Sequence, residues 1–142
     1  MKGNIDYIGY EEAMEAVKEG KIVFFYYRGM SVEIKPNCDL EYLRGKLMAH
    51  LSLTINDVIK GKYSAHLLHE LKILPGYFEE VEKGIKTFEI RKNDRDYQVS
   101  DFLLLKEFDP KTKTYTGKEI RKRISYMTDF NQKENYVVMA IV

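Results

Sequence analysis

Cysteine, tryptophan and proline are scarce in this chain. Its 142 residues include one cysteine, Cys38, no tryptophan and three prolines. A single cysteine excludes an intramolecular disulfide framework, which agrees with a reduced cytoplasmic compartment. No apolar run approaches the ~18 residues of a membrane-spanning helix, and no N-terminal segment has the basic-then-apolar pattern of a signal peptide. We therefore expect a cytoplasmic protein that has no membrane partner.

An excess of charge of one sign is absent as well. The 23 lysines and arginines almost balance the 22 aspartates and glutamates, so that the formal net charge is +1. The overall charge gives no indication of nucleic-acid or membrane binding, and any site for a polyanion has to be local. With 44% hydrophobic and 32% charged residues, the composition is that of a globular protein. The length allows one ordinary domain or two very small ones.

The first half of the chain predicts a small α+β module of unknown role over residues 1–64. Residues 10–19 carry apolar side chains at helical spacing and are followed by a glycine in the position of a C-cap. Residues 21–27 are β-branched and aromatic, which predicts a strand. A turn then leads into a second predicted strand over residues 31–35.

The segment that follows allows two interpretations. Residues 39–47 could form a helix, and residues 48–53 could equally form a strand. Residues 54–60 predict a short helix with a threonine cap. Residues 60–65 are polar and small, so we expect the domain boundary there and a second domain over residues 65–142.

Short strands dominate the second domain, and one helix lies among them. Pro75 begins the helix at a position where its missing N–H costs nothing, and Gly84 ends it. Strands are predicted over residues 69–73, 86–92, 101–108, 115–127 and 136–142. One helix among about five short strands is typical of a small, partly open β-barrel rather than a parallel sheet.

Residues 84–91, GIKTFEIR, carry a specific resemblance. They fit the signature G-x-K-x-x-E-x-R, through which the chain resembles the ASCH (activating signal cointegrator homology) family. The flanking sequences HELKILPGYFEEVEKG and RKNDRDYQVSDFLLLKEFD are similar to a bacterial and phage branch of that family whose function is unknown, and the resemblance spans residues 66–142. The branch usually has glycine where this chain has Ser100.

The resemblance implies both a fold and a class of ligand. The fold would be α+β, with a C-terminal PUA-like (ASCH) small mixed β-barrel with one or two helices, preceded by the small α+β module. The signature would line a cleft between the helix and the sheet. The implied ligand is RNA or a nucleotide, because PUA-like folds recur in RNA modification and translation. This step from fold to ligand is an analogy.

The strand over residues 86–92 alternates in character. Phe88 and Ile90 are expected to face the core, whereas Glu89 and Arg91 are expected to lie on the opposite face. The candidate ligand-binding residues are Lys86, Thr87, Glu89, Arg91 and Arg95.

Different roles follow from the chemistry of these side chains. Arg91 offers bidentate donors for a phosphate or a base edge, and Lys86 offers a point charge. Glu89 would accept a hydrogen bond from a base amino group or hold Arg91 in place. Arg95, in the turn-rich residues 93–96, would lie at the rim. The alternative interpretation is an exposed ion pair worth about 0–1 kcal/mol, followed by a solvated turn.

A local excess of positive charge occurs at residues 111–123, where six basic residues accompany one acidic residue. Such a segment indicates a surface that follows a nucleic-acid backbone, with tyrosines on which bases stack. The candidates for these contacts are Lys118, Arg121, Arg123, Tyr115 and Tyr126. The alternative is a solvated edge strand whose lysines prevent edge-to-edge pairing.

No metal site or cofactor is predicted. His66 and His69, together with His50 and Cys38, lack the paired cysteines or the third ligand at a fixed short distance that make zinc signatures specific.

An enzyme is the main alternative to a binding protein. Some small ASCH relatives are amidohydrolases that remove the acyl group from N4-acylated cytidine, and Lys86 matches their catalytic lysine. Glu89 stands where they have a catalytic threonine, and the neighbouring Thr87 is not at that position. Ribonuclease activity is also known in the family, and for an enzyme the candidate catalytic residues are Lys86 and Glu89. A third possibility is a phage-type interaction module that binds a protein partner through residues 1–64.

Overall fold

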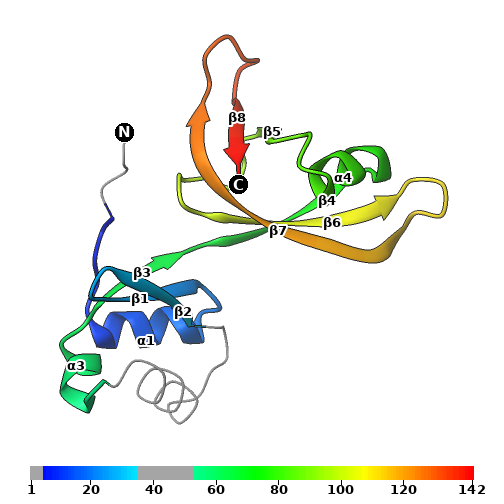
Figure 1. Ribbon diagram of the computed structural model, residues 1–142. Coiled ribbons are helices and arrows are strands. Elements are labelled where there is room, and N and C mark those ends of the chain that lie inside the picture. The colour runs from blue at the N-terminus through cyan, green and yellow to red at the C-terminus, as the bar shows by residue number, and fades with distance from the viewer. Residues whose placement is uncertain (1–4, 35–52) are drawn as a thin grey trace. The chain divides into compact units, whose positions relative to one another are not determined.

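The computed structural model describes residues 5–34 and 53–142, and the chain divides into two compact units, Met1–Leu67 and Leu68–Val142 (Figure 1). The described part has a mixed α+β architecture with three helices and with eight strands in two sheets. No helix in these ranges has the length and apolarity needed to cross a membrane.

Some predicted features lie outside the described residues. They are Cys38, His50, the possible helix over residues 39–47 and all but the last residue of the possible strand over residues 48–53.

The first unit is built on a three-stranded antiparallel sheet in the order β2-β1-β3. Its elements are α1 (Tyr10–Lys18), β1 (Ile22–Tyr27), β2 (Met30–Ile34), α3 (Ile55–Ile59) and β3 (Lys62–His66). Ala13 and Val17 from α1 share a buried cluster with Val23 and Phe25 from β1, so the apolar stripe of the helix covers the sheet. The helices and strands predicted within residues 10–35 and 54–60 are confirmed to within one residue at each end that the structure describes.

The segment over residues 60–65, where the domain boundary is expected, forms most of β3, and the two compact units divide after Leu67. Tyr63 is fully buried, and its hydroxyl donates a hydrogen bond of 2.7 Å to the Val58 carbonyl. Ser64 is buried as well, with its hydroxyl 3.0 Å from that of Tyr26. The small polar side chain of Ser64 is therefore an internal hydrogen-bonding group of the sheet.

A capping box begins α3. The Thr54 N–H donates to Asp57 Oδ2 at 2.9 Å, and the Asp57 N–H donates to Thr54 Oγ1 at 3.2 Å. The hydrogen bond from the Thr54 N–H, followed by that from its hydroxyl, holds the pKa of Asp57 below its ordinary value, because both stabilise the carboxylate.

The second unit contains a five-stranded sheet in the order β4-β6-β7-β8-β5. Its elements are β4 (Leu68–Ile73), α4 (Pro75–Glu82), β5 (Phe88–Lys92), β6 (Phe102–Asp109), β7 (Thr114–Thr128) and β8 (Tyr136–Ile141). The β4-β6 pair is parallel and the other three pairs are antiparallel. These elements agree with the predicted strands and helix.

β7 joins two parts of this sheet. Residues 114–123 pair with β6, and residues 124–128 pair with β8 after an irregularity next to Ile124. Figure 1 shows the strand bending between the two parts. Among the described residues the strands do not close into a barrel, because β4 and β5 remain edges of the sheet. The expectation of a barrel is corrected to an open, bent sheet.

Two arginines connect these edge strands. Arg91 Nη2 in β5 donates to the carbonyl oxygen of Lys72 in β4 at 2.8 Å, and Arg95 Nη1 donates to that of Glu70 at 2.6 Å. Side chains thus replace the strand pairing that would have closed the gap between β4 and β5, and they satisfy carbonyl groups of an edge strand.

The core of this unit contains Leu71 and Ile73 from β4 together with Leu103 and Leu105 from β6. Phe78 of α4 belongs to the same cluster. This places α4 on one face of the β4-β6-β7 part of the sheet.

A buried polar pair lies beside this core. His69 Nε2 is 2.9 Å from Asp101 Oδ2, and the Tyr97 ring packs edge-on to the imidazole at 4.8 Å. Burial raises the pKa of the Tyr97 phenol.

Candidate functional site

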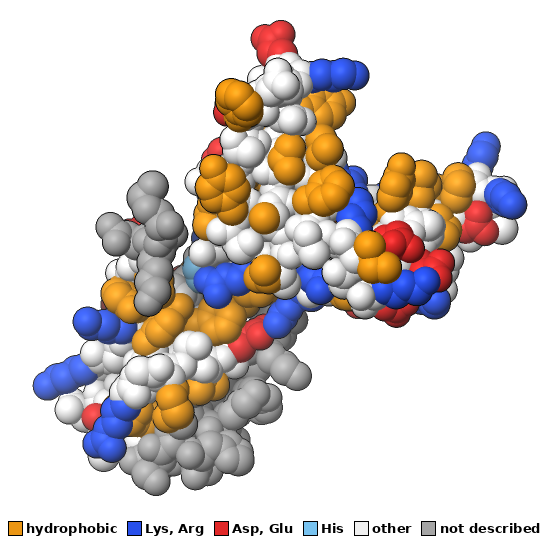
Figure 2. Space-filling model, turned by 45° about the horizontal axis from the view of Figure 1, so that its top comes forward, with side chains coloured by type: hydrophobic (Ala, Val, Ile, Leu, Met, Phe, Trp, Pro, Cys, Tyr) orange, Lys and Arg blue, Asp and Glu red, His pale blue; other side chains and the backbone are white. Residues whose placement is uncertain are grey.

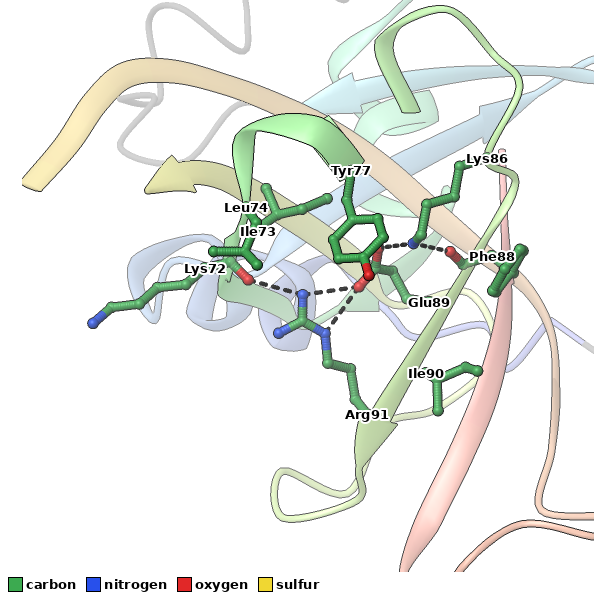
Figure 3. Close-up of a pocket in the computed structure, with 9 residues that line it drawn as sticks. All are labelled: Lys72, Ile73, Leu74, Tyr77, Lys86, Phe88, Glu89, Ile90 and Arg91. Atoms are coloured by element: carbon green, nitrogen blue, oxygen red, sulfur yellow. Dashed lines mark hydrogen bonds and ion pairs between the residues drawn. The ribbon is translucent and has the colours of Figure 1, made fainter. Parts of the chain in front are cut away.

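A pocket of about 490 Å³ lies where the end of β4 and the start of α4 meet β5 (Figure 3). The Pro75 start of α4 brings Tyr77 over the pocket, and the edge strand β5 contributes residues 88–91 to its wall. The nine residues that line it are Lys72, Ile73, Leu74, Tyr77, Lys86, Phe88, Glu89, Ile90 and Arg91.

Lys86, Glu89 and Arg91 form one ion-paired group in this pocket. Glu89 Oε1 accepts a hydrogen bond from Lys86 Nζ, while Oε2 accepts from Arg91 Nε at 2.9 Å and lies 2.8 Å from Nη2. The Glu89 side chain is only 4% exposed, compared with 16% for Lys86 and 26% for Arg91. A buried carboxylate therefore fixes two cations whose outer atoms remain accessible.

Several N–H donors of the two cations remain for a ligand. Arg91 uses Nε and Nη2 on Glu89 and the Lys72 carbonyl, and none of the described residues accepts a hydrogen bond from its Nη1. Lys86 Nζ donates to Glu89 and to the Phe88 carbonyl, which leaves one of its three hydrogens. Both oxygens of Glu89 are engaged, so of its two predicted roles the geometry favours the positioning of Arg91.

Aromatic rings flank Lys86. Its Nζ lies 5.8 Å from the ring centroid of Tyr77 and 4.9 Å from that of Phe88. Tyr77 is 57% exposed and Phe88 44% exposed, so both rings offer surface to a planar group. The pocket thus combines cationic donors with aromatic and aliphatic walls, which is the usual composition of a site for a small polar ligand.

The predicted orientation of β5 is wrong. Phe88 and Ile90 are 44% and 49% exposed, whereas Glu89 is 3% exposed. Phe88 lies opposite Ala140 of β8, which in turn lies opposite Tyr126 of β7, so these residues form one exposed apolar face. Hydrophobic side chains are visible at the surface of this part of the second unit (Figure 2). Glu89 occupies the inner face because its two cations neutralise it there.

Two of the predicted ligand-binding residues do not line the pocket. Thr87 is exposed, and its carbonyl oxygen accepts a hydrogen bond of 3.0 Å from the Ile141 N–H. Arg95 donates to the Glu70 carbonyl in β4 instead.

The three basic residues predicted to contact a backbone do not share one face. Arg121 and Arg123 lie over the Phe102 ring, at 5.0 and 5.6 Å from its centroid. Lys118 is on the opposite face of β7, on the side of Glu79 in α4. There the hydrogen bond from Lys83 holds the pKa of the Glu79 carboxyl below its ordinary value, and the positive charge of Lys118 adds a smaller effect in the same direction.

Lys72 and Tyr77 line the pocket but are not among the residues predicted from the sequence. Tyr77 has the helical spacing of the apolar stripe of α4, and only its place in the first turn of that helix indicates exposure. Lys72 contributes its carbonyl oxygen, a backbone group that residue type does not reveal.

In the part of the chain that the structure describes, no cluster of three or more His, Cys, Asp or Glu side chains could hold a metal ion. His69 is paired with Asp101, and His66 Nε2 lies 2.9 Å from the Ser64 hydroxyl.

Two comparisons with known proteins give relatives of this chain. The model of a family described as "Domain of unknown function (DUF3850)" matches residues 68–141. A protein of Escherichia phage P2, described as an uncharacterized 12.9 kDa protein in the GpA 3′ region, is 37% identical over 73 residues. That similarity covers 51% of this chain and 65% of the phage protein, so the chain spans less than two thirds of its relative's length.

Proposed function

The chain belongs to the family described as Domain of unknown function (DUF3850), and from this premise we propose that its second unit binds RNA or a nucleotide in the pocket between β4, α4 and β5. We propose further that the unit is an ASCH-type, PUA-like domain. The signature over residues 84–91 supports this, because its lysine, glutamate and arginine all line the pocket. A cytoplasmic location belongs to the same proposal and is supported by the low cysteine content.

The observation that carries the proposal is the placement of unused cationic donors beside aromatic rings. Arg91 Nη1 and Lys86 Nζ are suited to a phosphate group, because a guanidinium and an ammonium donate short, charge-assisted hydrogen bonds to anionic oxygens. The rings of Tyr77 and Phe88 lie next to these donors and are suited to the face of a base. A nucleotide presents both groups within a few ångströms of each other.

Fluorescence anisotropy with a labelled single-stranded RNA of mixed sequence tests the proposal. We expect the full chain to bind at low salt, and the affinity to fall steeply as salt is added, because phosphate contacts release counterions. In the Tyr77→Ala variant, which keeps every charge, we expect about fivefold or greater weakening from the loss of stacking. In a Lys86→Ala, Arg91→Ala double variant, binding is expected to be lost.

A control variant separates the pocket from general charge effects. Lys18 and Lys83 belong to exposed ion pairs with Glu15 and Glu79, so a Lys18→Ala, Lys83→Ala double variant removes the same charge elsewhere. It is expected to bind as the wild type does. Equal weakening in both double variants, or no binding of any RNA or nucleotide at low salt, would contradict the proposal.

The enzyme alternative receives less support from the geometry. An amidohydrolase mechanism needs a hydroxyl nucleophile next to Lys86, and Thr87 is not among the residues that line the pocket. A ribonuclease would need Glu89 as a proton acceptor, but both of its oxygens are already paired with cations. Incubation with N4-acetylcytidine or single-stranded RNA, followed by chromatography, is expected to return unchanged material.

A further inference from the structure

Lys72 belongs to two neighbouring surfaces. Its carbonyl oxygen is at the pocket, where it accepts the hydrogen bond from Arg91. Its side chain extends away from the pocket, as Figure 3 shows. The Nζ atom lies 4.4 Å from the ring centroid of Phe108 and 5.7 Å from that of Tyr115. One residue of the edge strand thus connects the pocket to an aromatic pair on β6 and β7.

This aromatic pair is accessible and lies among cations. The rings of Phe108 and Tyr115 meet edge to face, with centroids 5.3 Å apart, and Tyr115 is 49% exposed. Lys106 Nζ lies 5.2 Å from the Tyr115 centroid. The charges of the two lysines are only partly offset here, because Lys106 makes one ion pair of 3.5 Å with Glu70.

The strand register extends this surface along β6 and β7. Cross-strand neighbours share a face of the sheet, so the face opposite α4 can be followed row by row. The rows are Leu68, Phe102 and Arg123; Glu70, Leu104 and Arg121; Lys72, Lys106 and Glu119; and finally Phe108 and Tyr115. We call these eleven residues the outer face. It carries four cations, two carboxylates and three aromatic rings.

Packing of side chains explains only part of the outer face. Lysine and arginine stems often cover aromatic rings on an exposed sheet, and this explains the two arginines over the buried Phe102. It does not explain Tyr115, which remains half exposed under two lysines. Exposed aromatic rings among cations are the surface on which single-stranded nucleic acids stack their bases and pair their phosphates.

We propose that the outer face is a second subsite, in which a single strand continues from the pocket past Lys72 onto Tyr115 and Phe108. This inference rests on the proposed function and makes it more specific. The ligand is an oligonucleotide rather than a free mononucleotide, with one nucleotide in the pocket and an adjoining base on Tyr115. Phosphates of the strand lie near Lys72 and Lys106.

Calorimetric titration of the full chain with ligands of increasing length tests this inference. The probes are the four ribonucleoside 5′-monophosphates and single-stranded homo-oligoribonucleotides of the same bases, about four and about eight nucleotides long, which spans the smaller site sizes of single-strand binders. We expect the affinity to rise at least tenfold from the monophosphate to the oligomers. In Tyr115→Ala, oligomers should bind about 5- to 10-fold more weakly, whereas monophosphates should bind unchanged.

Matched variants make the result specific to the outer face. Tyr7 of the first unit is 49% exposed, as Tyr115 is, so Tyr7→Ala serves as the control and is expected to bind like the wild type. Tyr115→Phe retains the ring and should retain the affinity. A Lys72→Met, Lys106→Met double variant keeps the apolar stems but removes both charges. The slope of its log affinity for oligomers against log salt concentration should be smaller by the equivalent of about two phosphate contacts. The double variant also replaces Tyr115→Ala as the test if that variant does not fold.

The outcomes separate this inference from the proposed function. If monophosphates bind as tightly as oligomers, or if Tyr115→Ala and Tyr7→Ala have equal effects, the second subsite is refuted while the pocket remains. If hexaglutamate binds the wild type as tightly as the oligomers do, the outer face is a protein-binding surface and the inference is overturned. If neither monophosphates nor oligomers bind, the proposed function fails together with it.

Discussion

Glu89 determines how the cations of the pocket are arranged. It is almost completely buried, and each of its oxygens is paired with one cation, Lys86 or Arg91. A buried charge is tolerated only when it is paired, and loss of one partner leaves the remaining charges uncompensated. Glu89 is therefore a positioning residue, and the two cations are the groups that we propose as contacts of the ligand.

Glu89→Gln tests this role. The substitution keeps the shape of the side chain but leaves Lys86 and Arg91 together without a counter-charge. We expect the free energy of unfolding to fall by about 2–4 kcal/mol, as for other broken buried ion pairs. Urea denaturation at neutral pH measures it. A change below about 0.5 kcal/mol, the size typical of exposed sites, would show that the carboxylate is solvated and does not organise the pocket.

Ser100 occupies a backbone conformation that favours glycine. Its φ angle is +80°, in the left-handed region, where a side chain costs roughly 1–2 kcal/mol. Glycine also gives the unfolded chain more conformational freedom than serine does, and this offsets part of the gain from removing the strain. We therefore expect Ser100→Gly to stabilise the second unit by about 0.5–1 kcal/mol.

Thermal unfolding measures this gain, and Asn131→Gly is the control. Asn131 also has a positive φ angle, +55°, but asparagine tolerates this region, so a smaller gain is expected there. A lower melting temperature for Ser100→Gly than for the wild type would contradict the assignment of strain. The glycine that the ASCH branch usually has at this position agrees with the geometry found in this chain.

At the scale of elements, the gap between the edge strands β4 and β5 creates the pocket. Arg91 and Arg95 both bridge it to carbonyl groups of β4, but only Arg91 lines the pocket. Arg95, predicted from the sequence as a rim residue of the site, has a contact that explains its position without a ligand.

The two arginines are therefore expected to differ when replaced. Arg95→Ala should lower the free energy of unfolding by about 0.5–1.5 kcal/mol, the usual net value of one hydrogen bond, and leave RNA affinity unchanged. Arg91→Ala should lower both stability and affinity, the latter at least tenfold, because its donors also meet the ligand. Urea denaturation and anisotropy titration of both variants provide the measurements. Weaker RNA binding by a stably folded Arg95→Ala variant would restore the role predicted for it from the sequence.

Local signals made the elements of the second unit predictable. Pro75 and Gly84 mark the limits of α4, and short runs of β-branched and aromatic residues mark the strands. The alternation of apolar and charged residues along β5 indicated that the strand has two different faces, but not which face is buried. The buried face depends on the edge position of β5 in the sheet and on the cations beside Glu89. The bending of β7 and the resulting open sheet depend on long-range pairing, which no local pattern shows.

The same limits apply to the candidate site. Lys86, Glu89 and Arg91 were found because they are close in sequence and belong to one signature. Lys72 could not be found because it reaches the pocket through its carbonyl and through strand pairing far from the signature. The two-residue spacing of Arg121 and Arg123 places them on one face of β7, whereas Lys118 lies an odd number of residues away from both and is on the other face.

For the whole molecule, local arrangement of charge matters more than its sum. A net charge of +1 suggests no polyanion, yet cations predominate both in the pocket and on the outer face of the second unit. The first unit has its own sheet and its own core, and all the cations that we propose as RNA contacts belong to the second unit.

Chemical-shift mapping of the full chain by NMR tests this central claim most directly. The isotope-labelled protein is titrated with a mixed-sequence single-stranded RNA at low salt, where phosphate contacts are strongest. We predict that the largest backbone amide shifts occur at Tyr77 and at residues 86–91, with smaller shifts along β6 and β7 near Tyr115. Shifts confined to the first unit, or a spectrum unchanged at saturating RNA, would contradict the account.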